Sequence, residues 1–294
     1  MRYKSMPRRI FELFNYAFLL ALGLLCVLPF IHVIAISLSS AVEASANRVL
    51  FWPREFQTFA YEWLFKKKEI WTTLRNSFMR IAIGYCVNML LILITAYPLS
   101  KESGRFKART FYAWYFFFTM LFVNSIVPVF LIVRYTGLMG SFWALIIPGA
   151  VQVWNTILMM NFFRSLPKEL EESALMDGAG NVQTLFRIYV PVALPAIATI
   201  SLFVVLHHWN SWFDGFLYLA DISAYPFQTY LRSLVANTNM SGITNMMEIE
   251  DILKLSNKTT AAAQITLGAI PIFIIYPFLQ RYFVKGIVIG SIKG

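Results

Sequence analysis

Three polar side chains near residue 210 have types and spacing that suit proton transfer or ligand binding. His207, Asn210 and Asp214 are separated by three and four residues, which places them on one face of an α-helix. A histidine near a carboxylate can relay protons, and these groups can also bind a polar solute or contact a partner chain. A metal site needs more ligands than two adjacent histidines and one aspartate. We expect a structural contact first, a solute-lining face second, and a proton relay or a metal site last.

A second group of residues, between Arg164 and Pro191, has the pattern of two short capped helices. Pro167 suits the first turn of a helix, and the acidic residues that follow it favour a helix N-terminus. Gly178 can end that helix in the left-handed conformation, and Asn181 is expected to cap the next helix. The second helix would have one apolar face, made by Val182, Leu185, Phe186, Tyr189 and Val190.

This construction predicts a docking element for a partner protein. A loop that only joins two spans needs neither helix caps nor an apolar stripe. A helix lying on lipid is the alternative interpretation. The cluster of Glu169, Glu171 and Glu172 counts against it, because anionic headgroups repel carboxylates.

Membrane-spanning helices must position both groups. Apolar residues make up 58% of the 294 residues and charged residues only 14%, whereas soluble domains have about 45–50% and about 25%. Charged residues inside the predicted spans are Arg80 in the second and Asp214 in the fifth. Six stretches have the roughly 20 apolar residues that a bilayer requires, so we predict an all-α integral membrane protein with spans at about 14–38, 76–99, 111–133, 142–163, 193–218 and 261–280.

The basic residues predict the orientation of these spans. With a cytoplasmic N-terminus, the inside segments hold 14 lysines and arginines and the outside segments hold nine. Positive residues are enriched on the cytoplasmic side of membrane proteins, so both termini are predicted to be cytoplasmic. The net charge of +10 is then explained by topology and needs no nucleic acid partner. The two outside loops, about 39–75 and 219–260, are long enough to fold against another protein.

The segment between the fourth and fifth spans resembles the EAA loop of ABC-importer permeases, which has the pattern E-A-A-x3-G-x9-I-x-L-P. Glu172-Ser173-Ala174, Asp177-Gly178-Ala179 and Ile188-Tyr189-Val190-Pro191 fit this pattern without gaps. Ser173 stands in place of the first alanine, and Val190 in place of the leucine.

Further along the chain, Trp209-Asn210 and the ending Val284-Lys285-Gly286 through Ile292-Lys293-Gly294 are similar to the carbohydrate permeases of the maltose type. These permeases are MalG-like, and the ending resembles their LplC/YtcP-like branch. The resemblance covers roughly residues 70–294 and implies the type I importer (MetI-like) permease fold. It divides the chain into an N-terminal part, 1–75, and a core permease domain, 76–294, with the coupling loop at 164–191.

The resemblance implies a transport subunit of a bacterial inner membrane, and not an enzyme. The chain contains no G-x-x-x-x-G-K-[ST] phosphate-binding loop, so ATP and Mg²⁺ would be bound by two separate ATPase subunits and this chain would need neither a cofactor nor a metal. A second homologous permease, forming a hetero-dimer, and an extracytoplasmic solute-binding protein would complete the importer. The residues implied in coupling to the ATPase are Glu171, Glu172, Ser173, Ala174, Asp177, Gly178, Ala179, Ile188 and Pro191.

The expected solute is a sugar or an oligosaccharide. Sugars are bound by aromatic faces and by side chains that form several hydrogen bonds, so the candidates for the substrate path are Asn124, Trp154, Asn155, Trp209, Asn210, Trp212 and Asp214. For any single tryptophan, packing in the core or at the membrane interface is the competing interpretation. The alternatives for the whole protein are an ABC permease for peptides or amino acids, and a proton-coupled carrier that uses His207 and Asp214.

Overall fold

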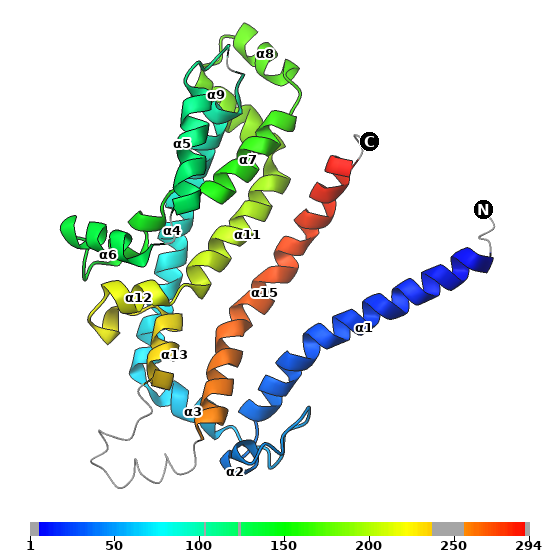
Figure 1. The fold of residues 1–294 in the computed structure, drawn as a ribbon, viewed down its shortest axis with the longest axis vertical. Helices are drawn as coiled ribbons and strands as arrows, with labels where there is room; N and C mark the ends of the chain where they lie inside the picture. Colours follow the sequence, from blue (N-terminus) through cyan, green and yellow to red (C-terminus); the bar gives the residue numbers. More distant parts are fainter. Residues whose placement is uncertain (1–5, 103, 123–124, 237–255, 292–294) are drawn as a thin grey trace. The chain divides into compact units, whose positions relative to one another are not determined.

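A computed structural model describes residues 6–102, 104–122, 125–236 and 256–291, apart from the side chain of Phe122 and some side chains in the last two helices. All regular elements in these ranges are helices (Figure 1). The helices before the coupling loop are α1 (Met6–Ser37), α2 (Ala41–Ser45), α3 (Phe59–Lys66), α4 (Lys68–Ser100), α5 (Arg109–Phe122), α6 (Ile126–Tyr135), η1 (Phe142–Leu145), η2 (Ile147–Gly149) and α7 (Val153–Ser165). The others are α8 (Glu169–Met176), α9 (Asn181–Thr184), η3 (Leu185–Tyr189), α10 (Val190–Val192), α11 (Leu194–Asn210), α12 (Phe213–Tyr218), η4 (Ile222–Ala224), α13 (Phe227–Ala236) and α15 (Asn257–Ser291).

Two of the described helices, α1 and α4, are long and apolar enough to cross a membrane alone, and three bent helix pairs qualify if each pair is one span. The expected stretch 261–280 lies within α15. The expected spans at 111–133, 142–163 and 193–218 each overlap one of these bent pairs, and residues 123–124 of the first lie outside the described residues. The second of these begins as η1 and η2, where Pro148 and Gly149 interrupt regular α-helix. The third ends its first helix at Asn210 and resumes as α12.

The chain forms two compact units, one of Met1–Lys68 with Ser233–Ile270 and one of Glu69–Arg232 with Pro271–Gly294. In the first unit, the hydroxyl groups of Ser37 and Tyr61 lie 2.7 Å apart and connect the end of α1 to α3. Glu43 there pairs with Arg48 and Arg54 at 3.2 and 3.5 Å. The division of the chain at residue 75 stays a prediction.

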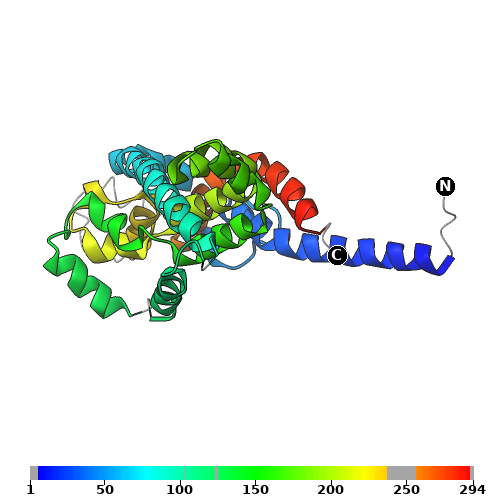
Figure 2. The ribbon, with the colours of Figure 1, turned by 90° about the horizontal axis from the view of Figure 1, so that it is seen from above.

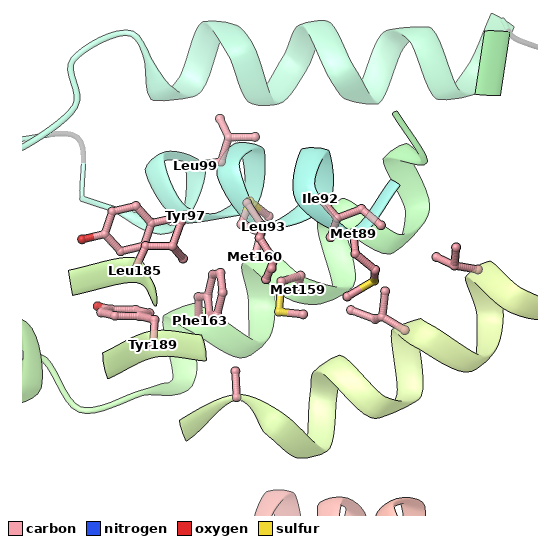
Figure 3. Packing of buried hydrophobic residues seen from close by; sticks show 14 residues of the cluster. Met89, Ile92, Leu93, Tyr97, Leu99, Met159, Met160, Phe163, Leu185 and Tyr189 are labelled. Atoms are coloured by element: carbon pink, nitrogen blue, oxygen red, sulfur yellow. The ribbon is translucent and has the colours of Figure 1, made fainter. Parts of the chain in front are cut away.

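The core of the second unit is built by α4, α7 and α11, which lie side by side (Figures 1 and 2). Their buried side chains include Ile92, Met159 and Val204, all with no exposed surface. At one end of this core the rings of Tyr97, Phe163 and Tyr189 pack edge to face, with centroids 5.0 to 6.5 Å apart (Figure 3). Tyr189 therefore anchors the coupling loop to α4 and α7, since such aromatic pairs add about 0.5–1.5 kcal/mol each.

The second helix of the coupling loop differs from the prediction. Gly180, and not Asn181, is the N-cap of α9, and its N–H group donates to the side chain of Gln183 at 3.3 Å. The helix then passes through a π-helical turn, η3, and bends by 87° before α11. The wider π turn splits the predicted apolar face: Leu185 and Tyr189 are buried, whereas Val182 and Phe186 are exposed, with Val190 between these extremes.

Candidate functional site

Helix α8 ends in a tight turn that requires a glycine. Gly178 has a φ of +77°, and the N–H groups of Gly178 and Ala179 donate to the carbonyls of Leu175 and Ala174 at 3.0 and 2.9 Å. These two bonds form a Schellman motif. The predicted left-handed conformation of Gly178 is confirmed.

Glu171 faces inward from α8 and holds this helix to the end of α4. Its carboxylate lies 2.8 Å from Lys101 Nζ and 2.9 Å from the guanidinium of Arg105, and it accepts a hydrogen bond from the Tyr189 hydroxyl at 3.2 Å. The ammonium of Lys101 also lies over the rings of Tyr97 and Tyr189, at 3.7 and 4.3 Å from their centroids. We call Glu171, Lys101, Arg105 and Tyr189 the Glu171 cluster.

Electrostatics favour the ionised form of Glu171. Burial acts to raise the pKa of its carboxyl group, but the hydrogen bond and charge of Lys101 and the charge of Arg105 outweigh burial and lower the pKa. The cluster therefore holds a carboxylate at neutral pH. Its attachment of α8 to α4 is ionic as well as aromatic.

The other expected coupling residues divide between the surface and the interior of the chain. Ala174 is buried and Ile188 is half-buried against the core of the second unit. Two apolar residues outside the expected set, Met176 and Val182, also lie on the surface and are 89% and 71% exposed. Ala179 is half-buried, and the exposed members of the expected set are Glu172, Ser173, Asp177, Gly178 and Pro191.

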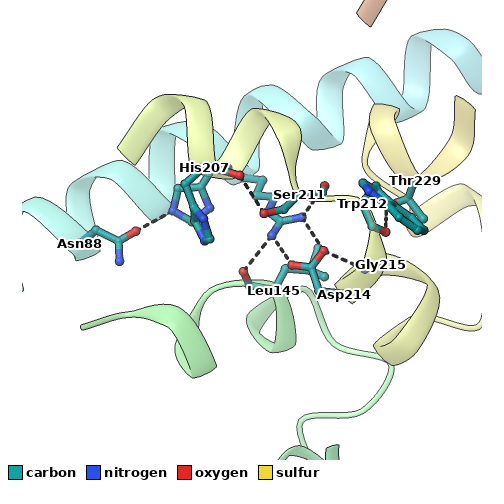
Figure 4. A network of polar contacts seen from close by, with 10 residues as sticks. Asn88, Leu145, His207, Ser211, Trp212, Asp214, Gly215 and Thr229 are labelled. Carbon is teal, nitrogen blue, oxygen red and sulfur yellow. Dashed lines mark hydrogen bonds and ion pairs between the residues drawn. The ribbon is translucent and has the colours of Figure 1, made fainter. Parts of the chain in front are cut away.

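A second polar cluster lies where α11 ends. Arg80 on α4 is 1% exposed, and its guanidinium forms a two-pronged ion pair with the carboxylate of Asp214. It also donates to the carbonyls of Ser211 and Leu145, both at 3.4 Å. Figure 4 shows Asp214 close to Ser211 and Leu145. Inside a membrane, a carbonyl freed by a helix break needs a new donor. Arg80 donates to one carbonyl at each of two such breaks, after α11 and at the end of η1. We call Arg80, Asp214 and the carbonyls of Ser211 and Leu145 the Arg80 cluster.

A hydrogen-bonded pair, Asn88 and His208, lies next to the Arg80 cluster. The side-chain amide of Asn88 donates to the carbonyls of Gly149 and Ala150 at 2.9 and 2.7 Å, which leaves its oxygen to accept from His208 Nε2 at 2.6 Å. His208 packs directly on Gly84 of α4, where a Cβ atom would overlap the imidazole. The close approach of α4 and α11 therefore requires a glycine here.

A surface pocket of about 590 Å³ collects part of the predicted substrate path, in which His207, Asn210, Trp212 and Asp214 line one hollow. They do so across a helix break and not along one helix face, because α11 ends at Asn210. The predicted continuous helix was wrong at this point, although the residues do converge.

The remaining candidates for the path lie apart from this pocket. Trp209 is 2% exposed and packs between Phe78 and Phe227, with ring centroids 6.2 and 5.9 Å away. Asn155 is buried and donates to Gln152. Trp154 is 61% exposed. Asn124 lies outside the described residues.

Residues 88–289 match the family of the binding-protein-dependent transport system inner membrane component. The match covers more than half of the chain. The chain belongs to this family. The permease is 39% identical to the polygalacturonan/rhamnogalacturonan transport system permease protein YtcP of Bacillus subtilis (strain 168), over 98% of its own length and 100% of the relative. It is 34% identical to protein LplC of the same organism, over 97% and 96%.

A solved structure supports the same assignment. The permease resembles a chain in the crystal structure of a bacterial ABC transporter involved in the import of the acidic polysaccharide alginate. The TM-score is 0.83 at 32% sequence identity, with coverage of 96% of the permease and 100% of that chain. The predicted ABC-importer permease of the LplC/YtcP-like branch, with an all-α fold and no enzymatic role of its own, is confirmed.

Sequence reasoning about this permease missed the partners within each cluster. Arg80 and Asp214 are charges inside two different predicted spans, and a charge at membrane depth usually has a partner. Pairing them was therefore possible from the sequence. Lys101 and Arg105 are among the basic residues that predict the topology, and nothing in their spacing assigns them to Glu171.

Proposed function

We propose that this permease forms half of the path for a sugar or oligosaccharide that an extracytoplasmic binding protein delivers. The observation that carries the proposal is the pocket of His207, Asn210, Trp212 and Asp214, which combines hydrogen-bonding groups with an aromatic ring. The named substrates of YtcP and of the alginate importer are acidic polysaccharides, which makes acidic oligosaccharides the first substrates to test.

Uptake by the assembled importer in proteoliposomes tests this proposal. With ATP inside and the binding protein outside, we expect accumulation of labelled galacturonate or alginate oligosaccharides. Asn210→Ala should raise the apparent KM, because it removes a hydrogen-bonding group from an exposed position of the pocket. Asn161→Ala, at an exposed asparagine of α7 outside both the pocket and the expected substrate path, is the control. Uptake of peptides or amino acids in place of sugars would overturn the substrate class.

We further propose that the exposed surface of α8 and α9 docks in an ATPase subunit. Glu172, Ser173, Asp177 and Gly178 lie on this surface, and the exposed Met176 and Val182 supply the apolar contact. Ala174 and Ala179 act from the inner side of α8, and Ile188 and Pro191 join the loop to α11. Glu171 supports docking indirectly, because its carboxylate is engaged by Lys101 and Arg105 of the same chain.

In this proposal both termini are cytoplasmic. The importer contains a second, different permease, two ATPase subunits that bind ATP and Mg²⁺, and a binding protein that contacts the loop 219–260. Residues 237–255 of that loop lie outside the described residues. Accessibility of single cysteines at Met176 and Ile222 to a membrane-impermeant reagent tests the orientation. Labelling of position 222 from outside intact cells, and of position 176 only after lysis, is the expected result.

A further inference from the structure

An apolar groove of about 380 Å³ lies between α5 and α7, close to the end of α4. Its volume is in the range of roughly 300–1,000 Å³ that is typical of ligand pockets. The groove has a polar end, where Arg109, Thr110 and Arg164 line it. The rest of the wall is mainly apolar, with Leu99, Ala113, Trp114, Phe117, Ile157 and Met160.

The two arginines at the polar end have no acidic partner among the described residues. Arg164 is oriented by the carbonyl of Leu99, to which its guanidinium donates at 3.0 Å. Arg109 begins α5, whose first turn has no acidic residue, and its Nε atom is buried without a hydrogen-bond partner in the described part of the chain. A helix N-terminus favours anions. At the N-terminus of α5, the guanidinium groups of Arg109 and Arg164 also lack an acidic partner within the described ranges.

The same two arginines also line a second, more polar hollow of about 270 Å³. Lys101, Arg105 and Lys168 lie in its wall, and these three cations pair with Glu102, Glu171 or Glu172. Arg109 and Arg164 therefore mark the boundary between an apolar groove and a polar hollow. A ligand that fits this boundary has an anionic head and a hydrocarbon tail.

We propose that the groove binds an anionic phospholipid, with its phosphate at Arg109 and Arg164 and an acyl chain along Trp114 and Phe117. The cytoplasmic leaflet is the source of the lipid, a point that rests on the orientation proposed above. Basic pockets between spanning helices at that surface suit anionic headgroups. A lipid here holds α5 against α7, next to the Glu171 cluster, and so stiffens the part of the permease that receives the coupling loop.

Native mass spectrometry of the assembled importer tests this site. The importer is reconstituted in nanodiscs of phosphatidylcholine with or without phosphatidylglycerol, and lipids retained after release are counted. We expect selective retention of phosphatidylglycerol and roughly fivefold weaker retention in Arg109→Gln and in Arg164→Gln, because each basic residue near a membrane surface contributes about 1 kcal/mol. Arg109→Lys should keep most of the retention. Ala113→Phe should reduce it without changing any charge, because it fills the apolar end.

Arg187→Gln is the matched control, since Arg187 is an exposed arginine of the coupling loop outside the groove. An equal loss in this variant would show a general charge effect and overturn the site. Excess inorganic phosphate should leave the lipid bound. Displacement by phosphate together with no effect of Ala113→Phe would show an anion site without a tail, which also overturns the proposal. So would a cross-link from a cysteine at position 113 to the second permease. Uptake, measured in parallel, separates failure of this site from failure of the transport function.

Discussion

Each of the two charged clusters of this permease holds an interrupted helix in place. The Glu171 cluster is partly exposed to water, whereas the arginine of the Arg80 cluster is buried. In the Glu171 cluster, one carboxylate has two cationic partners and a tyrosine, and the side chain of Arg105 is 44% exposed. In the Arg80 cluster, one guanidinium with 1% exposure serves one carboxylate and two backbone carbonyls. In the first cluster the carboxylate has two cationic partners, of which Arg105 is partly screened by water, whereas in the second every contact depends on Arg80. Loss of one group should therefore have unequal consequences.

Arg80→Met should have the largest effect. It leaves the two carbonyls without this donor and the Asp214 carboxylate with the Gly215 N–H group at 2.9 Å, and because Asp214 is 26% exposed the cost lies below the ~3–5 kcal/mol of a fully buried pair. We expect loss of assembled importer from the membrane and a lower thermal midpoint for what remains. Arg75→Met, at an exposed arginine of the same helix, should be close to the native protein. Equal behaviour of the two variants would break the comparison.

Gly178→Val should have the next largest effect, on coupling more than on assembly. A branched residue at a φ of +77° is strained by about 1–2 kcal/mol, although the surrounding space is open. We expect the exposed end of α8 to shift, so that ATP hydrolysis no longer drives uptake. Gly180→Val is the matched control, because Gly180 also has open space around it but a φ of −76°. Near-normal coupling in Gly178→Val would contradict the docking role of α8.

Glu171→Gln and Glu172→Gln remove the same charge from neighbouring positions. Glu171→Gln should destabilise the importer by about 1–2 kcal/mol. The value is kept low because water screens the interaction between Glu171 and the partly exposed Arg105. Glu172→Gln should leave stability nearly unchanged, since Glu172 is 61% exposed, and should reduce ATPase stimulation. Thermal midpoints and coupled ATPase rates of both variants separate anchoring from docking. A loss of stability in Glu172→Gln and a loss of ATPase stimulation alone in Glu171→Gln would instead assign anchoring to Glu172 and docking to Glu171.

The smallest expected effect is the pH dependence of the Glu171 cluster. Because the pKa of Glu171 is lowered in the folded protein, its stabilisation is fully present above the unfolded value of about 4.3 and is lost as pH falls through the folded value. The difference in thermal midpoint between the native protein and Glu171→Gln should therefore narrow as pH falls below about 4.3. A difference that stays constant with pH would show that the cluster is not ionic.

Local features of the chain were predictable where one residue decides the geometry. Gly178 was predicted to be left-handed because few other residues adopt that conformation at low cost. The N-cap is Gly180 and not Asn181, and the side chain of Gln183, three residues further on, accepts a hydrogen bond from the Gly180 N–H group.

Features that depend on other parts of the chain were less predictable. Hydropathy located the spans but not the break after Asn210, because that break depends on donors from Arg80, 131 positions from Ser211. The inward orientation of Glu171 likewise depends on Lys101 and Arg105 and has no signature within the loop itself. Both cases require long-range pairing, which patterns within one segment do not encode.

The π-helical turn at Leu185–Tyr189 has a consequence for insertions and deletions. Such a turn holds one more residue than an α-helical turn, and one residue corresponds to about 100° of rotation. Deleting a single residue from it would restore regular α-helix and rotate α8 and α9 by about 100° about the axis of the helix that α9, η3 and α10 form. Glu171 would then leave Lys101, so the length of this short segment sets the angular register in which the permease presents its cytoplasmic surface.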